Sequence, residues 1–310
     1  MIFVLRAIVV SLAFFVLLYS FLSMVVVLAW RGLRLCHFQS HFGARGLFAL
    51  RVIPFAISAA VSLLLTLPSF FLLEKHSLDE DMGTFVLGAC AVLILGTGIY
   101  RVLAAEARTR RVVSAYMENA IGVEANTVTP PIILAQSITP LMLVGVRAPR
   151  ILISASACKV LNDGELQAAV RHETAHSRSR DNLKKAILNC LPFPGMARLD
   201  EAWREASELA ADDGAVSSRD EALDLAAALI KLARHFPCQA VPDLATGLMS
   251  AVGSVTSRVE RLMAWKEASA ASPHRWHYII VVAFIAFFGL AVNLGPALVL
   301  VHSLTERLVP

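Results

Sequence analysis

The chain has 310 residues, of which 57% are hydrophobic and only 17% charged, and its mean hydropathy is +0.65. An ordinary soluble domain is about 45–50% apolar and about 25% charged, so this composition favours membrane spans over one large soluble core. The net charge of +4 is too small to indicate a nucleic-acid partner, and five scattered cysteines without a C-x-x-C pair argue against a disulfide framework.

Four apolar segments are predicted to span the membrane, because each can cross about 30 Å of hydrocarbon. They are roughly Ile8–Trp30, Val52–Leu73, Gly83–Leu103 and Tyr278–Val301. The first is too long for the apolar region of a signal peptide, and no small-x-small cleavage site follows it. The chain therefore divides into three predicted parts: three spans (1–103), a polar domain (104–275), and a fourth span with a short tail (276–310).

The charges between the spans predict the orientation. Arginines without acidic residues lie between the first two spans, and more arginines follow the third: Arg31, Arg34, Arg45, Arg51, Arg101, Arg108, Arg110 and Arg111. The loop between the second and third spans carries Glu74, Asp79, Glu80 and Asp81 against Lys75. By the positive-inside rule, we expect a multi-pass protein of the inner (plasma) membrane, in contact with lipid, with the polar domain in the cytoplasm and both termini outside.

The polar domain begins with a basic stretch, 104–119, that is predicted to be helical. Two short strands follow, 141–146 and 151–154, around a turn centred on Pro149. The polar domain, 104–275, has the size of an ordinary domain.

The next helix is predicted to start at a capping box formed by Asn162 and Glu165. It carries the H-E-x-x-H motif in His172, Glu173 and His176. On a helix, histidines four residues apart share one face, so both imidazoles can reach one metal ion. Glu173 then lies close enough to take a proton from water there. The ordinary alternative is a pair of solvated or core histidines.

A second helix supplies two carboxylates one turn apart, Glu208 and Asp212. We predict Glu208 as the third ligand of one zinc ion per chain, because a two-histidine, one-glutamate site leaves a position for catalysis. Asp212 is predicted to accept a hydrogen bond from the outer nitrogen of a ligating histidine. Asp181 either does the same or caps the following helix. His235 is a candidate for stabilising the oxyanion, although such a histidine more often lies at a helix end.

Several segments resemble the BlaR/MecR-type membrane metallopeptidases, the protease modules of β-lactam sensor-transducers: Val144–Ile153, Leu161–Leu166, His172–Asp181, Glu208–Asp213 and Ser257–Leu262. The resemblance covers about 104–275, and the order of three spans, peptidase and fourth span also matches. It implies a multi-span α-helical membrane protein with an inserted α+β zincin-like (gluzincin) metallopeptidase domain. His172, His176 and Glu208 would bind the zinc, and Glu173 would be the general base. Because only about nine residues follow the fourth span, we expect no penicillin-binding sensor domain.

The resemblance predicts a zinc endopeptidase that cleaves itself or a cytoplasmic repressor-like protein. Its partners would be a protein or peptide substrate and a signalling partner in the membrane, but no nucleic acid. CAAX-protease and HtpX-type quality-control enzymes share H-E-x-x-H and E-x-x-A-D, although the HtpX type places two spans before the motif. A non-catalytic membrane signalling scaffold is the third hypothesis.

Overall fold

The computed structural model describes residues 2–35, 43–73, 82–117, 130–135, 139–236, 244–248, 255–266 and 294–308. The chain forms two compact units. One consists of 1–36, 52–97 and 268–310, and the other of 37–51 and 98–267. The second unit therefore includes the first turns of a helix that the sequence places at the membrane.

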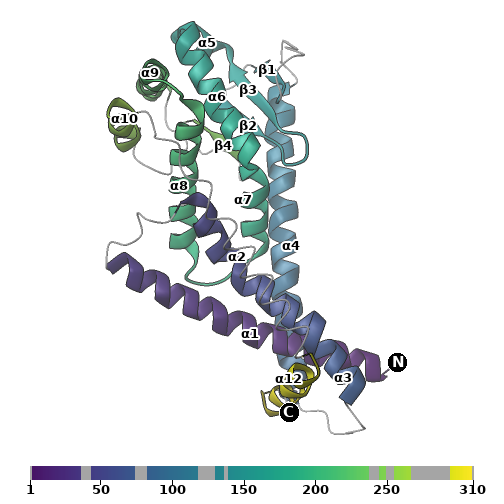
Figure 1. The fold of residues 1–310 in the computed structure, drawn as a ribbon. Helices are drawn as coiled ribbons and strands as arrows, with labels where there is room; N and C mark the ends of the chain where they lie inside the picture. Colours follow the sequence, from purple (N-terminus) through teal and green to yellow (C-terminus); the bar gives the residue numbers. More distant parts are fainter. Residues whose placement is uncertain are drawn as a thin grey trace. The chain divides into compact units, whose positions relative to one another are not determined.

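Among the residues that the structure describes, three helices are long and apolar enough to cross a membrane: Phe3–Leu33, Ala44–Leu73 and Met82–Ala115 (Figure 1). They contain the first three predicted spans. Most of the predicted fourth span, Tyr278–Val301, lies outside the described residues. Its last residues begin α12 (Leu294–Leu308), which packs against α1 (Ile2–Leu35) and α3 (Leu67–Leu73).

The second spanning helix is not a regular α-helix along its whole length. Between α2 (Ala44–Val61) and α3, residues Ser62–Thr66 form a π-helical turn, η2. Pro68 follows this turn and has no N–H to donate to the preceding turn. A locally widened turn lets the helix continue through such a proline.

The third span continues without a break into the basic stretch that was predicted as a separate helix. Together they form α4 (Met82–Met117). At the predicted boundary, residues 103–107 read Leu-Ala-Ala-Glu-Ala, a run of strong helix formers without a cap or a breaker. The helix therefore passes through the boundary.

The second unit is built on a four-stranded sheet in the order β1-β3-β2-β4. Its strands are β1 (Ile132–Ala135), β2 (Leu141–Val144), β3 (Arg150–Ser154) and β4 (Ala245–Gly247). β2 runs antiparallel to β3 and β4, whereas β1 is parallel to β3. The predicted hairpin of β2 and β3 is confirmed. The sequence analysis did not find β1 or β4, which are too short to show a clear alternation.

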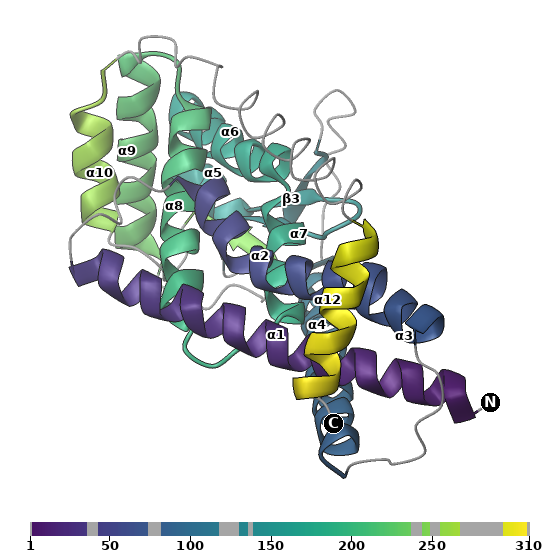
Figure 2. The same ribbon diagram turned by 60° about the horizontal axis from the view of Figure 1, so that its bottom comes forward.

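Six helices complete this unit: α5 (Ala155–Val160), α6 (Asp163–Ser179), α7 (Asp181–Cys190), α8 (Ala197–Ala215), α9 (Arg219–His235) and α10 (Val255–Met263). The predicted capping box starts α6, with Asn162 and Glu165 bonded reciprocally. α6 packs against β2, α8 and α9, and α9 packs against α10 (Figure 2). The histidine motif therefore lies on the most enclosed helix of the unit.

Within the second unit, two close contacts attach residues of α2 and α4 to α7 and α8. Arg51, on α2, is 2% exposed; its Nε lies 2.9 Å from Asp200 Oδ1 on α8, and its guanidinium also donates to the Leu191 carbonyl. On α4, Gly98 lies against the Cys190 carbonyl at the end of α7, so that an added Cβ would overlap it. These contacts hold α2 and α4 against the end of α7 and the first turn of α8.

We expect Gly98→Ala to lower the stability of the folded protein. The added methyl group meets backbone rather than a flexible side chain, and overpacking of this kind costs about 1–3 kcal/mol. A Gly-to-Ala change otherwise favours a helix by about 1 kcal/mol. Gly96→Ala is the matched control, since a Cβ at Gly96 meets nothing within 4 Å. Thermal unfolding of the detergent-purified protein should show a lower midpoint for Gly98→Ala alone; equal midpoints would contradict the tight contact.

Candidate metal centre

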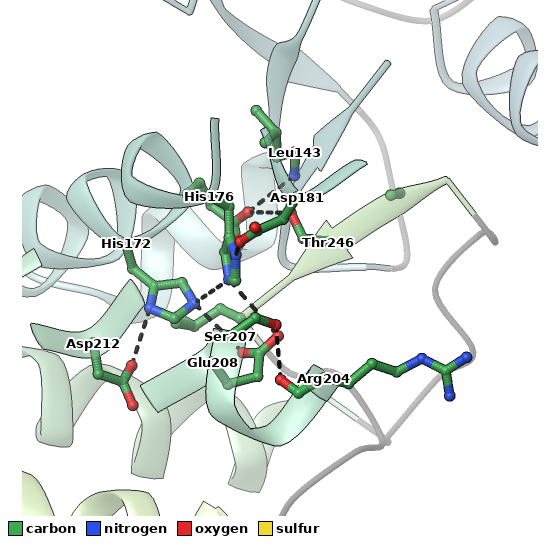
Figure 3. Close-up of polar contacts among 12 residues, drawn as sticks. Leu143, His172, His176, Asp181, Arg204, Ser207, Glu208, Asp212 and Thr246 are labelled. Atoms are coloured by element: carbon green, nitrogen blue, oxygen red, sulfur yellow. Dashed lines mark hydrogen bonds and ion pairs between the residues drawn. The ribbon is translucent and has the colours of Figure 1, made fainter. Parts of the chain in front are cut away.

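Three side chains from two helices converge on one buried point (Figure 3). His172 and His176 extend from α6 and are fully buried, and Glu208 extends from α8 and is 5% exposed. The two histidine Nε2 atoms are 3.2 Å apart. Glu208 Oε2 lies 3.6 Å from His172 Nε2, and Glu208 Oε1 lies 3.7 Å from His176 Nε2. Within the described part of the chain, these residues form a group able to hold a metal ion.

Carboxylates hold the outer nitrogens of both histidines. His172 Nδ1 lies 3.0 Å from Asp212 Oδ1, and His176 Nδ1 lies 2.7 Å from Asp181 Oδ2. An ionised carboxylate only accepts hydrogen bonds, so each of these Nδ1 atoms carries its proton. The Nε2 lone pairs of the two neutral rings consequently face one another. Without a cation or a proton between them, this arrangement is repulsive.

The donor set and its spacing fit a zinc ion. Ligand atoms about 2.1 Å from a tetrahedral zinc lie about 3.4 Å from one another, close to the distances between these three side chains. Glu208 Oε2 is buried and makes no hydrogen bond, although Arg258 Nη1 lies 3.2 Å away. Two imidazoles and one carboxylate leave a coordination position for catalysis. Sequence spacing predicted these three side chains, and the structure brings all of them together.

When no cation is present, bound protons neutralise part of the negative charge of this site. Burial acts to lower the pKa of His176, but Asp181 and Glu208 outweigh it and raise that pKa to about 9. The pKa of Glu208 is held well below its usual value, because His172 and His176 outweigh the effect of burial. Asp212 and Asp181 also have lowered pKa values, since each histidine stabilises its ionised partner against burial. The acceptors of the site are therefore ionised.

Glu173 is anchored through one oxygen only. Its Oε2 accepts hydrogen bonds from the Leu143 N–H on β2 at 3.1 Å and from Thr246 Oγ1 on β4 at 3.4 Å. Its Oε1 is buried and has no hydrogen-bond partner. Burial raises the pKa of Glu173, whereas the two histidines lower it. A carboxylate with one fixed and one free oxygen, and a raised pKa, suits the transfer of a proton.

Arg258, on α10, is the main site residue that the sequence analysis did not assign. Its Nε and Nη2 lie 2.8 and 2.6 Å from the two oxygens of Asp212, and its Nη1 lies 3.0 Å from the Leu248 carbonyl. Arg258 therefore holds the carboxylate that in turn holds His172. The segment Ser257–Leu262 was noted only for its resemblance, and no local sequence pattern signals that Arg258 is buried beside Asp212, which lies far from it in the chain.

Lys185 is a second residue that the sequence analysis did not place at the site. It extends from α7, and its Nζ donates to the Ala245 carbonyl on β4 at 2.6 Å. Burial lowers the pKa of Lys185 to about 8, against the attraction of Glu208, Asp181 and Glu173. This lysine ties β4 to α7 close to the buried carboxylates.

The remaining predicted residues have distinct outcomes. Asp212 contacts the outer nitrogen of His172, as predicted. Asp181 had two predicted roles; its carboxylate binds His176 and Lys184 and makes no capping hydrogen bond at the start of α7. His235 is exposed at the end of α9, where its Nδ1 lies 2.8 Å from the Lys231 carbonyl, and it does not belong to the metal-binding group. Of the two roles considered for His235, oxyanion stabilisation and a helix-end residue, the second is the one that the sequence analysis gave as more common.

Comparison with known proteins supports the family resemblance that the sequence motifs indicated. No curated protein gives a significant match to this chain. The model of one family, described as BlaR1 peptidase M56, matches residues 78–262, which is more than half of the chain and includes every residue of the buried cluster. The three membrane-length helices agree with a family of membrane metallopeptidases. The chain belongs to the BlaR1 peptidase M56 family.

Proposed function

We propose that the protein is a zinc-dependent endopeptidase of the membrane whose active site faces the cytoplasm. The observation that carries the proposal is the convergence of His172, His176 and Glu208 beside a buried glutamate with one free oxygen. A purely structural role would not require three buried lone-pair donors to face one another. The family assignment supports a peptidase.

The mechanism assigns the proton transfers to Glu173. When bound by His172, His176 and Glu208, zinc would polarise the scissile carbonyl and lower the pKa of water to about 7. Glu173 Oε1 would take the proton of the attacking water and pass it to the leaving amine nitrogen. The Leu143 N–H and the Thr246 hydroxyl hold Oε2 in place, so the free oxygen is the one aimed at the reaction.

We infer a regulatory substrate, the protein itself or a cytoplasmic repressor-like protein. Three helices of the described residues are long and apolar enough to anchor the protein in a membrane, and the loop charges favour a cytoplasmic peptidase domain. A signal would then arrive through the spans or through a partner in the membrane. An HtpX-like role in quality control fits the same chemistry and would give a broad set of cleaved proteins.

We expect Arg258→Met to weaken zinc binding by about 10–100-fold, because it releases the carboxylate that orients His172. Arg261→Met is the matched control: Arg261 pairs with the exposed Asp213, outside the cluster. Zinc affinity is measured by chelator competition on detergent-purified protein, with His176→Ala as the reference for complete loss. Arg258→Lys should restore only part of the affinity, because lysine cannot bind both oxygens of Asp212. Equal affinities for the Arg258 and Arg261 variants would contradict this role.

We expect Glu173→Gln to retain zinc but to lose at least about 10²-fold in the rate of peptide hydrolysis. Peptide termini from intact cells are compared between the wild type, Glu173→Gln and the exposed-site control Glu205→Gln. A cleavage present in the wild type and in Glu205→Gln, but absent from Glu173→Gln, identifies a substrate. Identical termini in all three strains, under envelope stress as well, would instead favour the non-catalytic scaffold.

We expect reporter fusions after Arg111 and after Val301 to report opposite sides of the membrane. The first lies within the arginine-rich end of α4 and should be cytoplasmic, and the second follows the predicted fourth span and should be outside. An alkaline phosphatase and a green fluorescent protein fusion at each position provide reciprocal readouts. The same side for both positions would mean that one predicted span does not cross.

A further inference from the structure

Leu143 of β2 connects the glutamate of the site to a second buried polar group. Leu143 donates its backbone N–H to Glu173, and its carbonyl accepts from Asn182 Nδ2 at 3.3 Å. The same Nδ2 donates to the Gly145 carbonyl at 3.0 Å. Asn182, near the start of α7, therefore binds one carbonyl within β2 and one just after the strand ends at Val144.

These contacts fix the direction of the Asn182 amide. Both partners of its nitrogen are carbonyl oxygens, which only accept, so the nitrogen must face β2 and the oxygen must face away. Asn182 is 3% exposed, and its Oδ1 has no hydrogen-bond partner. An unpaired buried acceptor costs about 1–3 kcal/mol. Such a cost is explained when a ligand supplies the missing donor.

Asn182 lines a pocket of about 270 Å³ that shares His176 with the metal centre. The turn between β2 and β3 forms one wall, and the junction of α6 and α7 forms the other. The pocket therefore adjoins the proposed point of cleavage and has room for one side chain with its backbone.

The charge of this pocket is positive. Arg147 and Arg180 line it, both are exposed, and neither makes an ion pair with any of the residues that the structure describes. The acidic wall residue, Asp181, is already neutralised, with His176 on one oxygen and Lys184 on the other. Arg180 is the only described non-glycine residue with positive φ, at 54°. This left-handed conformation, which is costly for such a residue, sets Arg180 between two helices at the pocket.

We propose that this pocket is a substrate subsite that takes an aspartate or glutamate side chain of an extended peptide. The peptide N–H donates to Asn182 Oδ1, and the acidic side chain pairs with Arg147 and Arg180. The inference rests on the proposed peptidase function, because it supplies the substrate class of that same site. Asn182 would thus recognise the main chain of the peptide, and the two arginines would select its side chain.

The test measures binding rather than cleavage, so its outcome is separable from that of the catalytic proposal. Full-length Glu173→Gln protein in detergent is mixed with extended peptide pools that differ at one position: acidic, amide, apolar or basic. Bound peptides are quantified by mass spectrometry. We expect acidic peptides to be enriched about tenfold over apolar ones, which corresponds to a difference of roughly 1.4 kcal/mol in binding free energy.

Two further variants test the side-chain part and the main-chain part of the contact separately. The double substitution Arg147→Gln and Arg180→Gly, made in the Glu173→Gln protein, should remove the preference for acidic peptides. Glycine at position 180 keeps the left-handed backbone. Arg178→Gln, an exposed arginine outside the pocket lining, is the matched control and should retain the preference. Asn182→Ala should weaken the binding of all peptides by about 3–10-fold, whatever their charge. Thermal unfolding identifies variants that fail to fold.

The proposal is overturned by a preference for amide peptides, by an acidic preference that survives loss of both arginines, or by no selective binding. Failure of the catalytic proposal would appear elsewhere, as unchanged peptide termini with Glu173→Gln, and would leave the measured binding preference intact.

Discussion

The site depends on the two carboxylate–histidine contacts that hold the imidazoles from behind. Asp212 fixes His172, and Asp181 fixes His176, so both free nitrogens face the same buried point. The arrangement concentrates negative charge where almost no water is available to solvate it. Protons relieve this only in part, which is why the pKa of His176 rises to about 9. A dication relieves it more completely, because all three donors then contribute lone pairs to one ion.

Long-range contacts hold the helix that supplies the third donor. α8 is tied near its first turn to Arg51 of α2 through Asp200, and one turn beyond Glu208 it is tied to α10 through Asp212 and Arg258. Glu208 lies between these two attachments on one rigid helix. Its position relative to α6 is therefore set by residues far apart in the chain, one of them on a helix long and apolar enough to cross a membrane. The local E-x-x-x-D spacing alone does not determine it.

The sequence predicted the parts of the site that depend on local periodicity. The H-E-x-x-H spacing, the capping box at Asn162 and the one-turn separation of Glu208 and Asp212 each follow from a single helix, and each was found. The sequence did not predict contacts that require the tertiary fold. Arg258 and Lys185 occur in ordinary amphipathic segments, and nothing in their neighbourhood distinguishes a buried cation from a solvated one. The same reasoning accounts for β4, which is defined by pairing with β2 rather than by its own three residues.

Leu143 of β2 connects the proposed base with the pocket that Asn182 lines. A strand residue presents its N–H and carbonyl to the same side, and Leu143 uses them for Glu173 and Asn182 respectively. Any change in the position of this strand moves both groups together. In the proposed mechanism, orientation of a peptide and activation of water are thereby coupled through one backbone residue, without a direct contact between the two side chains. Leu143 of β2 would then matter as much to the proposed cleavage as the histidine motif does.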